Sequence, residues 1–290
     1  MRKLTVLLVT ALVFLGAGGA YARDMLEIKG SDTLINLVQK LAEEYMSKNY
    51  TAIAVTGGGS GTGIAALING KCDIADASRT IKSKEVDSAS ANGIDVRRVV
   101  VAIDGLSFIV NKNNSVNRLT MDQLGKIFAG EITNWREVGG ADKAITLYGR
   151  QSNSGTYDFV KEVVIEGDYS SRMNQMNGNA QIVEAVKSDG SGIGYVGIGY
   201  IRGAAGITAL KVARSASSEY ASPLDTLKVK SGEYPVSRPL NQYVNGTPKG
   251  KVKDFIQFEL SPEGQKIVED EGFFAISKEY EELNKKTLGM

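Results

Sequence analysis

Three short segments carry the residue types that could bind an anion. They are GSDT at residues 30–33, GGGSGTG at residues 57–63 and GRQSNSGT at residues 149–156. Glycine allows an anion to approach backbone N–H groups closely, serine and threonine add hydroxyl donors, and Arg150 adds a positive charge. Ordinary helix capping explains any one of these segments, because serine, aspartate and threonine are common N-caps. Three segments of the same kind favour one shared anion site.

The composition excludes several kinds of catalysis. The chain has 290 residues and no histidine, so it cannot build a Ser-His-Asp triad, an HExxH zinc site or an imidazole acid–base pair. Its single cysteine, Cys72, can form neither an internal disulfide nor a thiolate metal cluster. The net charge of +1 provides no basic field for nucleic acid or an anionic membrane. A bound anion therefore depends on local donors.

The first 22 residues have the pattern of an export signal. Basic residues at positions 2 and 3 precede an apolar run at residues 4–15, and an A-x-A motif follows at residues 20–22. The apolar run is short for a bilayer core about 30 Å thick, so a membrane anchor is the weaker alternative. We expect cleavage after Ala22, a mature chain that begins at Arg23, and a periplasmic location.

Each glycine-rich segment is expected between a strand and a helix. Alternating apolar residues predict strands at residues 26–28, 53–55 and 145–147. Apolar residues at helical spacing predict helices at residues 34–45, 64–68 and 159–164. A helix N-terminus leaves backbone N–H groups without partners and carries the positive end of the helix dipole. Each segment would therefore direct donors at a common anion.

The rest of the chain continues the alternation of strands and helices. Further strands are expected at residues 72–77, 99–103, 106–110 and 193–196. A capping box from Thr120 to Gln123, and Ser261 before Pro262, predict the starts of two more helices. Residues 215–233 are polar, with few apolar residues, and are expected to form a surface excursion. The alternation predicts an α/β fold.

These residues and motifs resemble those of the periplasmic phosphate-binding proteins, which deliver inorganic phosphate to an ABC importer. The resemblance extends from residue 28 to about residue 274. Besides the three glycine-rich segments, it includes DIADASR at 73–79, LGKIFAGEITNW at 124–135, IGYV at 193–196 and SPEGQ at 261–265. It implies the two-lobe Venus-flytrap architecture of type II periplasmic binding proteins, with two hinge crossings and a ligand cleft between the lobes.

The resemblance also implies a division of the chain. Residues 1–22 would be the signal peptide, residues 23–103 and 234–290 would form lobe 1, and residues 104–233 would form lobe 2. The first two glycine-rich segments then belong to lobe 1 and the third to lobe 2, so a shared anion would hold the lobes together. The expected partners are inorganic phosphate and the inner-membrane permease of the importer, and we expect a monomer.

Carried over residue by residue, the resemblance implies a phosphate site that consists of Ser31, Asp32, Thr33, Ser60, Ser78, Arg79, Arg150, Ser154, Gly155 and Thr156. The planar fork of Arg150 suits a tetrahedral oxyanion. Arg79 has an alternative role, as a brace of the cleft or the partner of an acid. The resemblance implies no catalytic residue, metal, cofactor or nucleic acid. A binding protein for sulfate or molybdate, and an exported phosphoester hydrolase, are the alternative functions.

The chain departs from the family pattern in its acidic residues. Some members have an aspartate at the position of Ser78 and another at the position of Ser152. Near pH 7 phosphate carries at least one proton and sulfate carries none, so a site that separates them needs a buried acceptor. Asp32 is the candidate for that acceptor. Alternatively, Asp32 caps the helix expected to begin at Thr33.

Overall fold

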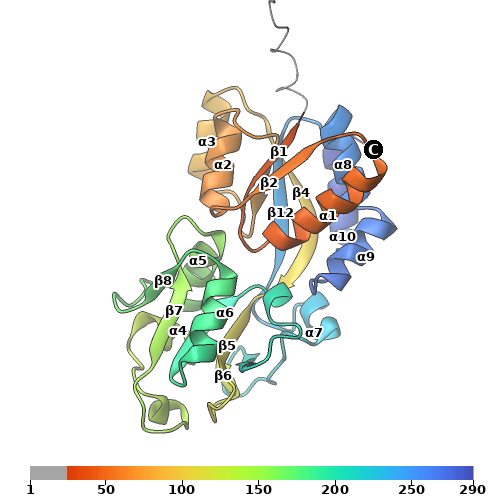
Figure 1. Ribbon diagram of the computed structural model, residues 1–290. Helices are drawn as coiled ribbons and strands as arrows, with labels where there is room; N and C mark the ends of the chain where they lie inside the picture. The colour runs from red at the N-terminus through yellow and green to blue at the C-terminus, as the bar shows by residue number, and fades with distance from the viewer. Residues whose placement is uncertain (1–24, 290) are drawn as a thin grey trace, which may run out of the picture.

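The computed structural model describes residues 25–289, which form two lobes around two five-stranded sheets (Figure 1). The α/β class and the two-lobe architecture expected from the sequence are confirmed. The expected signal peptide and its cleavage after Ala22 lie outside the described residues. Within residues 25–289, no helix combines the length and the apolar character that a membrane crossing requires.

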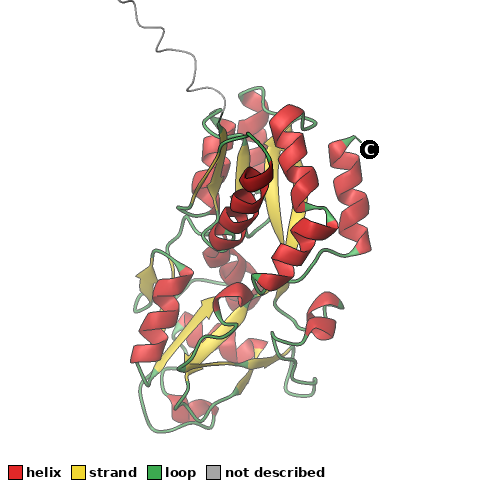
Figure 2. Cartoon of the chain, turned by 45° about the vertical axis from the view of Figure 1, so that its right-hand side comes forward, coloured by secondary structure: helices red, strands yellow, loops and turns green. Residues whose placement is uncertain are grey.

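The first sheet and its helices consist of β1 (Leu26–Gly30), β2 (Ile53–Thr56), β3 (Ile74–Ala77), β4 (Val96–Gly105), β12 (Ser237–Asn245), α1 (Ile35–Lys48), α2 (Ser60–Ile68), α3 (Ser83–Ala91), α8 (Gly250–Glu259), α9 (Pro262–Asp270) and α10 (Lys278–Leu288). The strand order is β2-β1-β3-β12-β4. β1 is parallel to β2 and β3, whereas β12 is antiparallel to β3 and β4. Figures 1 and 2 show helices on both faces of this sheet, and in Figure 1 α2 and α3 lie on the side away from α1.

The second lobe contains β5 (Ser107–Asn111), β7 (Thr146–Arg150), β8 (Asn174–Met176), β9 (Gly192–Val196), β10 (Ile207–Ala209), α4 (Met121–Ala129), α5 (Gly155–Val160) and α6 (Asn179–Ser188). Its sheet has the order β10-β5-β9-β7-β8, with β7 parallel to both of its neighbours. A small parallel sheet joins β6 (Arg118–Thr120) to β11 (Lys211–Ala213). A short helix, α7 (Thr226–Lys230), follows before the chain returns to the first sheet.

Two connections between the sheets lie side by side. The chain leaves the first sheet at Gly105, enters the second at Ser107 and returns to the first at Ser237. Ser237 pairs with Gly105 across β12 and β4, so both connections cross at one place. A rotation at this place would move one lobe against the other.

Several local expectations are confirmed. The apolar positions expected on one face of α1 are buried. Thr120 Oγ1 accepts a hydrogen bond from Gln123 N at 3.2 Å, which begins α4 with the expected capping box. Ser261 Oγ accepts from Gly264 N at 3.1 Å, which begins α9 with proline at its first position.

Two helices differ from the sequence expectation. α2 begins at Ser60, inside the glycine-rich segment, because Gly63 allows the helix to pack directly on β1; a Cβ atom there would lie 2.3 Å from Lys29 O. The helix expected at residues 159–164 is divided into α5 and a π-helical turn at Lys161–Ile165. The wider turn changes which side chains face inward, so Val164 is buried while Val163 is 39% exposed.

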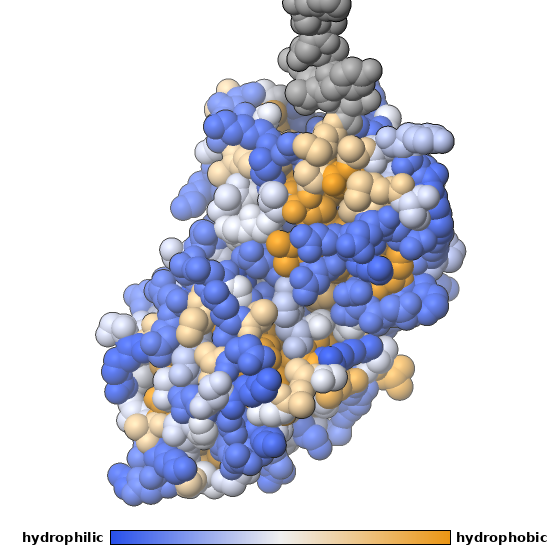
Figure 3. Space-filling view, viewed as in Figure 1, coloured by the Kyte–Doolittle hydropathy of each residue, from blue (hydrophilic) through white to orange (hydrophobic). Residues whose placement is uncertain are grey.

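Hydrophilic residues cover much of both lobes on the face shown in Figure 3, and apolar residues lie among them in smaller groups. The expected surface excursion at residues 215–233 is largely exposed, although α7 lies within it. Leu224 and Leu227, with exposed fractions of 50% and 81%, belong to this excursion.

Candidate anion-binding site

The three glycine-rich segments meet where the lobes touch. The first two follow β1 and β2, whose carboxyl ends lie at the same edge of the first sheet. Gly59 N donates to Gly30 O at 2.9 Å, and Gly61 N donates to Asn153 O at 3.0 Å. Asn153 Nδ2 donates to Gly58 O at 2.9 Å. A Cβ atom on Gly59, whose φ is +90°, would lie 2.5 Å from Asn153 O, so this contact requires glycine.

Four buried hydroxyl groups form a chain between the lobes, which we call the hydroxyl cluster: Thr33, Ser60, Ser78 and Thr156. The Oγ atoms of Ser60 and Ser78 lie 3.3 Å apart. Thr156 Oγ1 lies 3.3 Å from Ser78 Oγ and 3.0 Å from Thr33 Oγ1. A Cβ atom on Gly155 would lie 2.3 Å from Ser60 Oγ, so only glycine permits this approach. Thr156 belongs to the second lobe and the other three members of the cluster to the first.

Two other expected residues hold turns in place. Ser31 Oγ accepts a hydrogen bond from Thr33 N at 3.2 Å. Ser154 Oγ accepts from Thr156 N at 3.2 Å and from Tyr157 N at 3.4 Å, and so caps α5. Both serines are buried. Their hydroxyl groups organise the backbone around the hydroxyl cluster.

An ion pair between Arg150 and Asp32 joins the lobes beside the hydroxyl cluster. Arg150 ends β7 and is 2% exposed. Its Nη2 group contacts Asp32 Oδ2 and donates to Asn177 O at 2.8 Å, while its Nε group donates to Met176 O at 3.3 Å. Asp32 Oδ1 accepts from Gly58 N at 2.8 Å. None of the hydrogen bonds described for Arg150 uses Nη1.

The alternative role of Asp32 as a helix cap is wrong. The N-cap position of α1 is Leu34, and no side chain makes a capping hydrogen bond there. The second lobe instead holds the Asp32 backbone, because Tyr200 Oη and Asn179 Nδ2 donate to Asp32 O at 2.6 and 3.2 Å. This leaves the carboxylate facing Arg150.

Arg79 forms a different interaction from the other expected residues. Its Nη1 and Nη2 groups donate to the two oxygens of Glu85 at 2.8 and 2.7 Å, and its Nε group lies 2.9 Å from Asp158 Oδ2. Lys82 Nζ donates to the same Asp158 oxygen at 2.7 Å. Burial lowers the pKa of Arg79, but hydrogen bonding to Glu85 and both carboxylates outweigh it and raise the pKa. Because Asp158 belongs to α5 and the other three residues to the first lobe, this geometry corresponds to the alternative role of Arg79 as a brace.

Sequence reasoning missed Arg238 and Asp104. Arg238 lies on β12 and is buried, with Nε and Nη2 donating to Asp104 Oδ2 at 3.0 and 2.8 Å. Its Nη2 group also donates to Thr156 Oγ1 at 3.0 Å, and its Nη1 group donates to Ser78 O at 2.8 Å. Arg238 lies within residues 237–245, which form a largely buried strand. Because an unpaired charge in such a strand would be costly, an arginine there is the sequence signal for a buried acidic partner.

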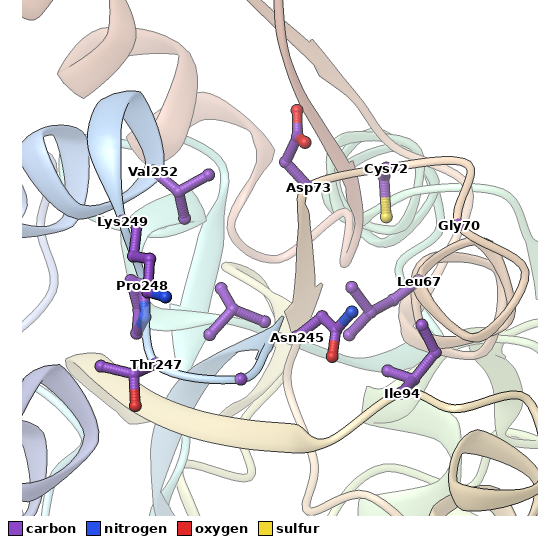
Figure 4. A pocket seen from close by; sticks show the side chains of 12 residues that line it. Leu67, Gly70, Cys72, Asp73, Ile94, Asn245, Thr247, Pro248, Lys249 and Val252 are labelled. Atoms are coloured by element: carbon purple, nitrogen blue, oxygen red, sulfur yellow. The ribbon is translucent and has the colours of Figure 1, made fainter.

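A cavity of about 680 Å³ lies at the opposite edge of the first sheet (Figure 4). Cys72 and Asp73, which precede β3, line it together with Lys249. Ser78 follows the other end of β3, so the cavity is separate from the hydroxyl cluster. Burial raises the pKa of the Cys72 thiol to about 12, which keeps it protonated and unreactive near neutral pH.

Comparison with known proteins first defines the class. A family model described as a PBP superfamily domain matches residues 16–263. The two lobes, the paired crossings and the interlobe hydroxyl cluster agree with this match.

Similar proteins define the family more narrowly. The phosphate-binding protein PstS of Pseudomonas aeruginosa is 33% identical over 281 residues, which cover 90% of this chain and 86% of the relative. The phosphate-binding protein PstS of Bacillus subtilis is 33% identical over 267 residues, covering 90% and 83%. The chain belongs to the PstS family of phosphate-binding proteins within the PBP superfamily.

Solved structures agree with this assignment. A phosphate ABC transporter substrate-binding protein from Clostridium perfringens, crystallised with bound phosphate, has a TM-score of 0.77 and 29% identity, with 87% of this chain and 100% of that chain covered. An ABC-type phosphate transport receptor from Vibrio cholerae has a TM-score of 0.70 and 27% identity, with 87% and 100% covered.

Proposed function

We propose that this protein binds inorganic phosphate between its lobes and delivers it to an ABC importer. The observation that carries the proposal is the buried hydroxyl cluster, to which both lobes contribute, with Arg150 beside it. The phosphate-binding names of the relatives and the bound phosphate of the Clostridium perfringens structure support the same ligand.

The donors come from several directions and suit a tetrahedral anion. Thr33, Ser60, Ser78 and Thr156 offer hydroxyl groups, and the guanidinium of Arg150, paired with Asp32 next to Thr33, adds a positive charge. In the structure the hydroxyl groups bond to one another, so an anion that enters between the lobes exchanges these bonds for stronger ones to a charged acceptor. Such a ligand favours the closed form because only closure brings donors from both lobes together.

We propose that Asp32 separates phosphate from sulfate. Each of its carboxylate oxygens has one described donor, Arg150 for Oδ2 and Gly58 N for Oδ1, and a carboxylate oxygen can accept a second. A proton on phosphate would supply that donor, whereas an unprotonated sulfate oxygen would be repelled. Sulfate and molybdate binding are therefore the disfavoured alternatives.

We propose a binding role and no enzymatic one. Among residues 25–289, no described hydrogen bond joins a carboxylate to a hydroxyl group of the hydroxyl cluster. A phosphoester hydrolase would need such a base beside its nucleophile. The relatives are named as substrate-binding transport proteins, which supports the same conclusion.

We propose export to the periplasm with cleavage after Ala22, and a monomer that docks on an inner-membrane permease. Lobe 1 would comprise residues 23–103 and 234–290, and lobe 2 residues 104–233. Mass spectrometry of the exported chain tests the cleavage site, because any mature N-terminus other than Arg23 contradicts it.

Calorimetric titration tests the ligand. The mature protein is unfolded and refolded to remove endogenous ligand, then titrated separately with phosphate, sulfate and molybdate. We expect one phosphate per chain with a Kd in the micromolar range or tighter, about −8 kcal/mol or better. The absence of both heat and a thermal shift at millimolar phosphate would contradict the proposed function.

A further inference from the structure

Arg238 touches both lobes at the point where the chain crosses between them. It lies on β12, next to Ser237, whose partner Gly105 ends β4. Its guanidinium donates to Ser78 O in the first lobe and to Thr156 Oγ1 in the second. Its Cζ atom also lies 5.0 Å from the centre of the Phe159 ring, which belongs to α5.

The hydrogen bond to Thr156 determines how that hydroxyl group can act. Thr156 Oγ1 has neighbours at 3.0 Å in Arg238 Nη2 and Thr33 Oγ1, and at 3.3 Å in Ser78 Oγ. A hydroxyl group has one proton and two acceptor positions. Since a guanidinium can only donate, it occupies one acceptor position and leaves the Thr156 proton available to donate within the cluster.

The Arg238–Asp104 pair presents its positive end to the hydroxyl cluster. Both side chains are buried, at 3% and 0% exposure. Asp104 Oδ2 accepts from Arg238, and Asp104 Oδ1 accepts from Ile198 N at 2.8 Å, so neither oxygen contacts the cluster. A negative charge placed among the four hydroxyl groups would lie nearer to the guanidinium than to the carboxylate.

We propose that Arg238 is a second positioning cation of the anion site, which orients the Thr156 hydroxyl proton toward the ligand and favours the more highly charged anion. This inference rests on the proposed phosphate function. It assigns a ligand-linked role to a hinge residue that lies outside the three glycine-rich segments. The same contacts link anion charge to lobe closure, because Thr156 and Phe159 reach Arg238 only when the second lobe is in place.

The first test is Arg238→Lys, which keeps a positive charge opposite Asp104. An ammonium group cannot contact Asp104, Ser78 O and Thr156 Oγ1 with the geometry of a guanidinium. We expect the phosphate Kd from calorimetry to rise about tenfold, because one charge-assisted hydrogen bond is weakened. In a double-mutant cycle with Thr156→Val, the Kd of the double variant should rise clearly less than the product of the two single-variant rises. Fully multiplicative effects, or an unchanged Kd in Arg238→Lys, would overturn the role.

The second test removes both charges with Arg238→Met/Asp104→Asn. The phosphate Kd is measured at one pH below and one pH above the second ionisation of phosphate, where the ligand is mainly the monoanion and mainly the dianion. We expect a larger loss for the dianion than for the monoanion. The matched control makes the same changes in the exposed ion pair of Arg97 and Asp95. Arg97→Met/Asp95→Asn should leave the Kd of the monoanion and of the dianion unchanged. A folded double variant with the parent's pH profile would overturn the inference. Failure of the parent itself to bind phosphate would instead reject the proposed function.

Discussion

In our proposal, Arg150 is the side chain on which anion affinity most directly depends. It is almost fully buried, and its only described carboxylate partner, Asp32, comes from the other lobe. We expect Arg150→Ala to weaken phosphate binding by about 2–5 kcal/mol, the usual cost of truncating one partner of a buried charge pair. Arg150→Lys should recover only part of this, because an ammonium lacks the planar fork. Calorimetry measures both values.

Arg136→Ala is the control for this prediction. Arg136 pairs with Asp142 on the exposed surface of the same lobe, where ion pairs contribute little. Its loss should leave the phosphate Kd unchanged. If Arg150→Ala bound phosphate as the parent does, the third glycine-rich segment would be structural only.

Asp32 determines selectivity in our proposal. Asp32→Asn removes the negative charge that would repel an unprotonated oxygen, and it frees Arg150 for any anion. We expect weaker phosphate binding and stronger sulfate binding, measured by titrating each anion into the same stripped protein. Asp122→Asn, an exposed change with the same chemistry, should alter neither. An unchanged phosphate-to-sulfate ratio in Asp32→Asn would remove the acceptor role.

At the scale of the elements, sequence reasoning succeeded where the determinant is local. The apolar face of α1 and the caps at Thr120 and Ser261 depend on residues within a few positions of one another. Each could therefore be read from spacing alone. The start of α2 was missed because it depends on the contact between Gly63 and β1, which spacing does not reveal.

The parts of the site that could not be predicted depend on pairing between distant strands. Arg238 reaches Ser78 and Asp104 because β12 inserts between β3 and β4, although it lies 160 and 134 positions away from them in the sequence. The sequence allowed an acidic partner for Arg79, but that partner, Asp158, comes from the other lobe. Only the assembled fold shows that acid beside it.

The contact between the α3 region and α5 is expected to stabilise the closed form. Arg79 and Lys82 both meet Asp158 across the lobes. We expect Asp158→Asn to raise the phosphate dissociation rate a few-fold, corresponding to roughly 1 kcal/mol, since Arg79 keeps its second partner Glu85 and Lys82 is 33% exposed. Added salt should reduce the difference, because screening weakens the parent's ion pairs. Stopped-flow release into a phosphate trap measures the rate.

Glu162→Gln provides the control for Asp158→Asn. Glu162 is an exposed acid four positions further along the chain, in the π-helical turn. Its neutralisation should leave the release rate unchanged. Equal release rates in Asp158→Asn and the parent at low salt would show that the ion pairs of Asp158 with Arg79 and Lys82 do not hold the lobes together.

At the scale of the whole molecule, two buried carboxyl groups link folding to pH. Gln242 Nε2 donates to Asp76 Oδ1 and to Glu259 Oε1, both at 3.1 Å, inside the first lobe. Burial raises the pKa of Asp76 to about 8, and burial together with Asp76 raises the pKa of Glu259. The Asp76 backbone also accepts from Ser31 N at 2.9 Å, so this pair lies directly behind the first glycine-rich segment.

The sign of the pH effect follows from these raised pKa values. An unfolded aspartate titrates near a pKa of about 3.9, so between that value and about 8 the folded chain holds more protons than the unfolded chain. The free energy of unfolding should therefore fall as pH rises through this window, by up to about 1.4 kcal/mol per pH unit for one group, and level off above it. Asp76→Asn should flatten the slope and stabilise the protein most at pH 8 and above. Urea unfolding from pH 5 to pH 9 in phosphate-free buffer measures this without a contribution from ligand.

Asp87→Asn, on the exposed surface of α3, should keep the parent's slope. If Asp76→Asn kept that slope as well, Asp76 would be ionised in the folded chain and its buried charge would need a partner other than Gln242.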